Sequence, residues 1–209
     1  MCSSDLELSL EEAALKNINV HANWQKQFDD MMQLQRERSQ TATKGQFKGG
    51  LGGQTMQHKK YHTATHLMYE SLRRTLGDHV IQKGSNITED RLRFDFTHAE
   101  KLTNEEIQKV EDMVNEQIKQ DLIVTFEEHP TKYALEKLKP LGHFGDRYGD
   151  VIKIYRMQAK GGKVPFSYEI CGGPHVDRTG QLAESGKTFK IVKEEASSAG
   201  VRRIKAVLV

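Results

Sequence analysis

The sequence predicts an α+β fold in which a mainly antiparallel sheet packs with helices and is preceded by a short helical segment. Alternating apolar and polar residues, as in Arg91–Phe96, indicate half-buried strands. Other segments repeat apolar residues at the spacing of an amphipathic helix. Short turns join many of the predicted strands, which favours antiparallel pairing.

Residues 1–44 are expected to be helical, with a second helical run that begins near Asn23. The apolar positions of this run are sparse. The segment therefore needs a packing partner, because isolated helices are only marginally stable in water. Residues 1–6 match the translation of a common sequencing adaptor and are left out of the fold prediction.

Residues 45–57 are expected to be a linker that marks a domain boundary. The stretch Gly45–Gly53 is rich in glycine, whose backbone freedom favours flexibility. A phosphate-binding loop is the alternative interpretation. It is the weaker one, because the stretch has neither the lysine–serine pair of a P-loop nor the spacing of a dinucleotide site.

Residues 58–209 are expected to form the main domain. A helix over Lys59–Leu76 has one apolar stripe and ends at Gly77. Thr103, followed three residues later by Glu106, predicts a capping box at the start of a second helix. The other predicted elements are strands at Val80–Ile87, Arg91–Phe96, Leu122–Phe126, Val151–Met157, Val164–Ile170, Thr188–Lys193 and Val201–Val209, and a short helix at Thr131–Leu138.

The composition indicates a soluble protein of a reducing compartment. The 209 residues have a formal net charge of +2, with 36% hydrophobic and 29% charged residues. The only cysteines are Cys2 and Cys171, so we expect no disulfide scaffold. We expect a cytoplasmic location instead. No apolar stretch approaches the length of a membrane span, and the N-terminus lacks the apolar core of a signal peptide, so no membrane partner is expected.

A split cluster of possible metal ligands is the strongest chemical feature. His62 and His66 lie four residues apart on a predicted helix, so their side chains project from the same face. Cys171 and His175 lie in a glycine-rich loop after a predicted strand, which allows both side chains to turn towards one ion. One thiolate and three imidazoles form a donor set suited to a single zinc ion.

Each half of this cluster has a simpler explanation when taken alone. Histidine pairs at helical spacing are frequent by chance, and a single cysteine is most often a buried apolar residue. Only the combination is specific, and it requires the two halves to meet in the fold. A zincin protease is disfavoured, because Thr63 stands where that mechanism requires a glutamate directly after the first histidine.

Five short motifs occur in a fixed order along the chain. They are His62-Thr-Ala-Thr-His66-Leu, Gln82-Lys-Gly84-Ser, Arg91-Leu-Arg-Phe-Asp95-Phe, Cys171-Gly-Gly-Pro-His175-Val and Ser198-Ala-Gly-Val-Arg-Arg-Ile204. Together they resemble the editing domain that alanyl-tRNA synthetases, threonyl-tRNA synthetases and freestanding alanyl-tRNA editing proteins share. The resemblance extends from about His58 to Val209.

The segments Leu6–Glu12 and Gln35–Ser39 resemble the end of the helical, tRNA-recognising part of alanyl-tRNA synthetase. The resemblance therefore implies a fragment, in which the N-terminal aminoacylation domain and the C-terminal coiled-coil region of the intact enzyme are absent. Pro174 departs from this pattern, because threonine is more common there in the alanyl family. Proline is typical of threonyl enzymes, which in turn usually have arginine in place of Gly172.

The resemblance implies an ester hydrolase that edits Ser-tRNA(Ala) or Gly-tRNA(Ala) at the acceptor end of tRNA(Ala). A pocket for alanine rejects glycine and serine poorly, so a second site must remove these errors. The residues implied are Thr65, Gln82 and Cys171 for catalysis, Gly84, Arg91, Gly172, Gly173 and Arg202 for substrate contacts, and His62, His66, Cys171 and His175 for zinc. Further groups should fix the histidine tautomers, and Asp95 and Asp177 are candidates for this role.

Several alternatives are open at this point. Zinc with three protein ligands would keep a position for water or substrate, whereas zinc with four would be mainly structural. The specificity could be that of a threonyl-type or freestanding deacylase. A different class of protein, a non-catalytic zinc-stabilised tRNA-binding module, would use the same ligands. No aminoacylation motif is visible in the sequence.

Overall fold

The computed structural model describes residues 26, 29–31, 33, 52–142 and 149–209. The chain divides into two units, Met1–Gly45 and Gln46–Val209. The described residues of the first unit are helical, as expected. The rest of the predicted helical segment, and the linker before Gly52, lie outside the described residues. No helix within the described part of the chain is both long and apolar enough to cross a membrane.

Helix α3 (Met56–Leu76) is the central element of the second unit. It begins three residues before the predicted start, because the side chain of Thr55 caps it by accepting a hydrogen bond from His58 N. It ends at Gly77, whose positive φ of 114° suits glycine and whose N–H bonds Arg73 O. The middle of α3, from Tyr61 to Tyr69, is buried throughout, which is possible only if other elements surround it.

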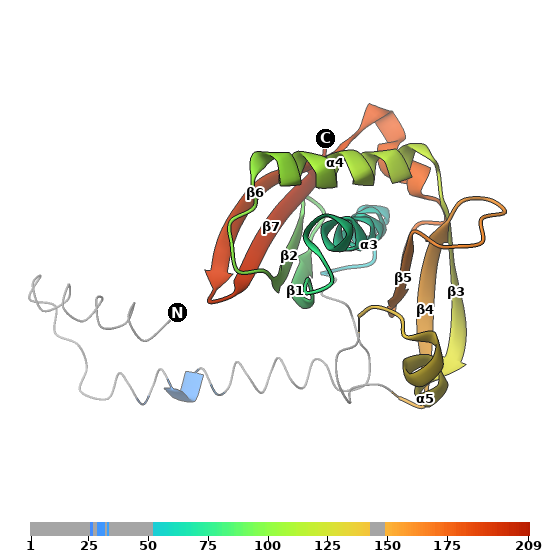
Figure 1. The fold of residues 1–209 in the computed structure, drawn as a ribbon, viewed down its shortest axis with the longest axis horizontal. Helices are drawn as coiled ribbons and strands as arrows, with labels where there is room; N and C mark the ends of the chain where they lie inside the picture. Colours follow the sequence, from blue (N-terminus) through green and yellow to red (C-terminus); the bar gives the residue numbers. More distant parts are fainter. Residues whose placement is uncertain (1–25, 27–28, 32, 34–51, 143–148) are drawn as a thin grey trace, which may run out of the picture. The chain divides into compact units, whose positions relative to one another are not determined.

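A four-stranded antiparallel sheet lies on one side of α3 (Figure 1). Its order is β1 (Gln82–Ile87), β2 (Leu92–Thr97), β7 (Val201–Leu208) and β6 (Phe189–Ser198). The alternation predicted for the second of these strands is confirmed, since Leu92, Phe94 and Phe96 are all fully buried. Helix α4 (Asn104–Lys119) contacts α3 and β6, and the predicted capping box of Thr103 and Glu106 is present.

A second, three-stranded antiparallel sheet lies on the other side of α3. Its order is β3 (Ile123–Pro130), β4 (Val151–Gln158) and β5 (Ser167–Ile170). The short helices α5 (Thr131–Tyr133) and η1 (Ala134–Leu138) follow β3, and a small core of Ala134, Ile152, Ile154 and Ile170 joins η1 to one face of this sheet. On the opposite face, Met157 packs into the main core. Strand β5 of this sheet contacts α3.

The mainly antiparallel α+β prediction is thus confirmed, with two sheets around one helix. The predicted strand from Val164 starts later, at Ser167, because β4 ends one residue after Met157, the partner of Ser167, and Val164 is left 81% exposed. The 3₁₀ segment η2 (Thr179–Gly186) was not expected from the sequence. It is anchored by the buried hydroxyl of Thr179, which donates to Gln117 O and accepts from Leu122 N.

Candidate metal centre

The buried face of α3 supplies two of the predicted metal ligands. His62 and His66 lie one helical turn apart and are only 3% and 6% exposed. Both point to the same side of the helix, as their spacing predicted. Burial of two imidazoles on a helix face requires polar partners, because an unsatisfied buried polar group is costly.

The loop after β5 supplies the other two ligands. Cys171 and His175 are buried, and the loop between them turns at Gly173, where φ is 66°. A side chain at Gly173 would overlap the hydroxyl of Tyr155, so this position requires glycine for space as well as for conformation. The N–H of Gly173 donates to Cys171 Sγ at 3.3 Å, which favours a thiolate.

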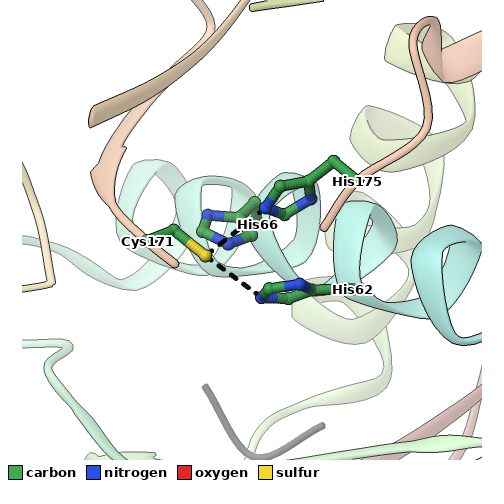
Figure 2. Close-up of side chains that lie close together, drawn as sticks. All are labelled: His62, His66, Cys171 and His175. Carbon is green, nitrogen blue, oxygen red and sulfur yellow. Dashed lines mark hydrogen bonds between the residues drawn. The ribbon is translucent and has the colours of Figure 1, made fainter. Parts of the chain in front are cut away.

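The two halves of the cluster meet, as Figure 2 shows. One ligand atom from each of the four residues lies within 4.8 Å of the others. Cys171 Sγ is 3.2 Å from His62 Nε2 and 3.4 Å from His175 Nε2. Residues more than a hundred positions apart in the sequence thus form one compact donor set.

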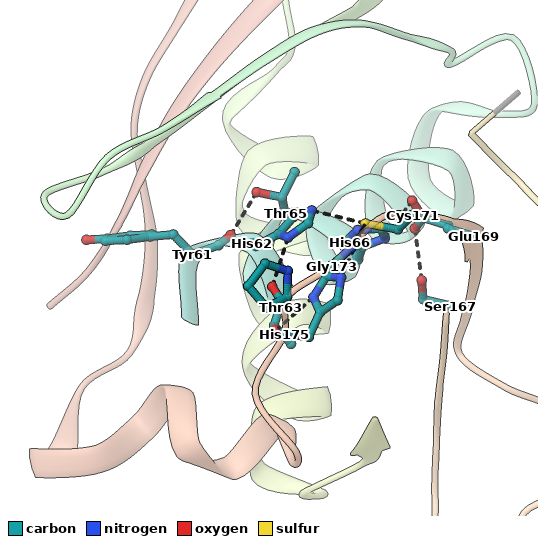
Figure 3. A network of polar contacts seen from close by, with 11 residues as sticks. Tyr61, His62, Thr63, Thr65, His66, Ser167, Glu169, Cys171, Gly173 and His175 are labelled. Atoms are coloured by element: carbon teal, nitrogen blue, oxygen red, sulfur yellow. Dashed lines mark hydrogen bonds and ion pairs between the residues drawn. The ribbon is translucent and has the colours of Figure 1, made fainter. Parts of the chain in front are cut away.

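The outer nitrogen of each ring faces a group that accepts hydrogen bonds (Figure 3). His62 Nδ1 lies 3.0 Å from the carbonyl oxygen of Pro174. His66 Nδ1 lies 2.8 Å from Glu169 Oε2 and forms an ion pair with it. These acceptors place the proton of each ring on Nδ1.

Thr63 sets the same tautomer for His175. Its Oγ1 donates to Lys59 O at 2.9 Å, so it can only accept from His175 Nδ1 at 3.2 Å. The same oxygen also accepts from Val176 N at 3.2 Å. With a proton fixed on Nδ1 of each ring, Nε2 is the atom that can offer a lone pair to a metal ion.

The charges of the cluster fit a cation. Burial opposes ionisation of Cys171, but His62, His66 and His175 outweigh it and hold the thiol pKa well below its usual value. Burial, followed by the neighbouring His62, lowers the pKa of His175 to about 3, so this ring is neutral. A thiolate and converging imidazole lone pairs are the chemistry of a zinc-type site, so the residues present fit such an ion.

His66 behaves differently from the other rings. Burial lowers its pKa, but Glu169 and then Cys171 outweigh burial and raise the pKa to about 10. Without a metal ion the His66 ring therefore carries a second proton, on Nε2. Metal binding must displace this proton, as is usual for metal-ligating histidines.

A pocket opens at the cluster, and all three predicted catalytic residues, Thr65, Gln82 and Cys171, line it. Thr65 Oγ1 donates to Tyr61 O at 2.8 Å and keeps its acceptor lone pairs. The pocket is lined by His62, Thr65, His66, Tyr69, Gln82, Ser85, Phe94, Gly142, Glu169, Ile170 and Cys171. Residues of β1, β2 and β5 and the buried face of α3 thus line one pocket.

The predicted substrate contacts are divided between two places. Gly172 and Gly173 lie in the loop that carries Cys171 and His175. Gly84, Arg91 and Arg202 do not line the pocket. Arg202 Nε is bonded to Glu194 Oε1 at 2.5 Å, so its guanidinium already has a carboxylate partner.

The prediction that Asp95 and Asp177 orient the metal ligands is wrong. Asp95 accepts two hydrogen bonds from Arg203, at 2.7 and 2.8 Å, because β2 and β7 pair directly opposite each other there. Asp177 is exposed, and its N–H bonds Gln181 Oε1 instead. The groups that do face the rings are Pro174 O, Thr63 and Glu169.

Glu169 could have been found from the sequence. It lies two residues before Cys171, and side chains at this spacing share one face of a strand. The same alternation that sends Ile170 into the small core sends Glu169 towards α3. Thr63 gave no comparable signal, because its role depends on a loop that is distant in sequence.

Residues 152–205 match the family described as threonyl and alanyl tRNA synthetase second additional domain. An alanine–tRNA ligase of Treponema denticola is 47% identical over 203 residues, which cover 97% of this chain and 32% of that enzyme. An alanine–tRNA ligase of Borreliella burgdorferi is 50% identical over 78% of this chain and 26% of its own length. One of Coxiella burnetii is 47% identical over 70% of this chain and 16% of its own length. The chain thus spans about a third or less of the length of these curated relatives.

Proposed function

Because this chain belongs to the alanyl-tRNA synthetase family, in which it corresponds to the part with the second additional domain, we propose that it hydrolyses mischarged aminoacyl-tRNA. The bond cleaved is the ester that joins serine or glycine to the 3′ end of tRNA(Ala). The observation that supports this most is the junction of the ligand cluster with a pocket lined by Thr65 and Gln82. The tRNA acceptor end is the proposed partner, and the cytoplasm is the proposed location.

The proposed cofactor is one zinc ion held by His62, His66, Cys171 and His175. Zinc bound there would supply a Lewis acid that polarises an ester or a water molecule, or would order the site if all four side chains stay bound. The chain's own contribution is to fix the Nδ1 protons of the rings and to bury the thiolate.

Thr65 and Gln82 are the proposed contacts to the serine hydroxyl. Thr65 has free acceptor capacity on a buried helix face, and Gln82, the first residue of β1, lines the same pocket. An alanine ester lacks the hydroxyl, so buried polar groups would stay unpaired against it. This difference would spare the correct product while serine is removed.

The five proposed substrate contacts then have different tasks. The backbone of Gly172 and Gly173 can approach the ester closely, because neither residue has a side chain. Gly84, Arg91 and Arg202 lie outside the pocket lining, so they would contact parts of the tRNA beyond the aminoacyl group.

A deacylation assay with purified chain tests the proposal. Ser-tRNA(Ala) and Gly-tRNA(Ala) are expected to be hydrolysed faster than Ala-tRNA(Ala), and Thr65→Val is expected to reduce the preference for serine. Faster hydrolysis of Ser-tRNA(Thr) would favour the threonyl-type specificity that Pro174 suggests. A chain that binds zinc and tRNA but hydrolyses none of these esters would instead be a zinc-stabilised tRNA-binding module.

A further inference from the structure

A buried carboxylate lies beside the metal centre. Glu169, in the middle of β5, is 3% exposed and faces α3. It stands opposite Tyr155 in the register of β4 and β5 and lines the pocket. A carboxylate this deeply buried needs a cation or several hydrogen bonds to remain charged.

The partners of Glu169 form a short chain that ends at a metal ligand (Figure 3). Its Oε1 accepts from the buried hydroxyl of Ser167 at 2.8 Å, and its Oε2 lies 2.8 Å from His66 Nδ1. Within residues 52–142 and 149–209, the ion pair recorded for Glu169 is with His66 alone. No lysine or arginine of these residues forms an ion pair with it, so His66 is its cationic neighbour there.

Glu169 also differs from the groups that hold the other two rings. His62 is held by a backbone carbonyl and His175 by a hydroxyl, both of which are neutral. Only His66 is held by an anion. A divalent cation with one thiolate has a net charge of +1, which a single carboxylate balances in a low-dielectric interior.

We propose that Glu169, fixed by Ser167, is a positioning residue of the metal centre. It holds His66 with Nδ1–H towards the sheet and the Nε2 lone pair towards Cys171, and it balances the charge of the bound ion. This inference rests on the metal site of the proposed function. It assigns to β5 a residue that increases metal affinity without contacting the metal.

The test is the zinc affinity of the full 209-residue chain, measured by competition with a chromophoric chelator. Glu169→Gln keeps the size and an acceptor oxygen but removes the charge, and it is expected to weaken zinc binding by about 10- to 100-fold. Glu169→Asp keeps the charge but shortens the reach, so it should recover part of the loss. Cobalt(II) absorption of the same variants reports the ligand field, and Glu169→Gln is expected to shift it.

Glu111→Gln is the matched control. Glu111 is likewise buried and uses both oxygens, on Lys190 Nζ and Ile191 N, each at 2.7 Å, but it does not line the pocket. It is expected to lower stability and to leave zinc affinity within about twofold. An equal loss of zinc affinity in Glu111→Gln would overturn the inference, because general destabilisation would then explain both variants.

The inference and the proposed function fail in different ways. Wild-type zinc affinity and an unchanged cobalt spectrum in Glu169→Gln would overturn the inference and leave the function intact. A wild-type chain that binds no zinc would overturn both. If Glu169→Gln does not fold, the zinc affinity of Ser167→Ala is the test. This substitution removes the hydrogen bond that fixes Glu169 and keeps the carboxylate. A several-fold loss of zinc affinity in Ser167→Ala supports the inference, and no loss refutes it.

Discussion

Replacement of Thr63 by valine removes one buried hydroxyl that holds the loop of Cys171 and His175 against α3. Valine has nearly the same shape, so the change creates no cavity. The hydroxyl accepts from His175 Nδ1 and Val176 N, both at 3.2 Å, in a fully buried position. The substitution therefore leaves two buried donors without an acceptor.

The magnitude follows from these two donors. Each buried donor that loses its partner costs about 1–3 kcal/mol, so Thr63→Val is expected to lower the free energy of unfolding by about 2–4 kcal/mol after some relaxation of the loop. The carbonyl of Lys59 loses the hydrogen bond from the Thr63 hydroxyl but keeps its helical hydrogen bond, so it is not left without a donor. Zinc affinity is expected to fall about tenfold or more, because the tautomer of His175 is no longer fixed.

Thr65→Val on the same helix is the control. Thr65 Oγ1 donates to Tyr61 O and accepts from no protein donor recorded among the described residues, so its removal leaves no donor unpaired. Its effect on stability is expected to stay within about 1 kcal/mol. Urea unfolding of chelator-treated chains gives both values without a contribution from bound metal. Equal stabilities of the two variants would refute the reasoning.

Three further predictions concern the loop and the metal. Cys171→Ser should reduce both zinc content and Ser-tRNA(Ala) hydrolysis at least tenfold, because a hydroxyl is a poor substitute for the thiolate that the cluster stabilises; full zinc content in the variant would contradict this. Gly173→Ala should cost more than about 1–2 kcal/mol and weaken zinc binding, because φ is positive and a methyl group would overlap Tyr155. Gly161 has a similar φ but open space around it. Gly161→Ala should therefore lower the free energy of unfolding only by the cost of the positive φ and leave zinc affinity unchanged. Removal of zinc by a chelator should lower the Tm, and added zinc should restore it in a concentration-dependent way; a Tm independent of zinc would contradict the site.

Local patterns in the sequence predicted the secondary structure and half of the site's geometry. The capping box of Thr103 and Glu106 is formed within three residues, and the common face of His62 and His66 follows from the helical period. The burial of Leu92, Phe94 and Phe96 follows from strand alternation. Such features depend on neighbours in the chain, so the sequence alone is sufficient for them.

Contacts between distant residues could not be predicted in the same way. Asp95 was expected beside the metal ligands, but the pairing of β2 with β7 places it opposite Arg203, which donates hydrogen bonds to its carboxylate. Likewise, the sequence did not reveal that Arg202, predicted as a substrate contact, pairs with Glu194 across β6 and β7. Which charged side chains meet depends on strand register, and a shift of one residue would exchange these partners.

The sequence by itself determined which residue types could bind a metal and which pairs of them share a helix face or a loop. Only the tertiary structure decided that the helix face and the loop meet, with Cys171 Sγ 3.2 Å from His62 Nε2. It also decided that Thr63, Pro174 and Glu169 hold the outer nitrogens of the rings. The physical reason is that the packing of α3 between two sheets brings together residues whose separation along the chain carries no local signal.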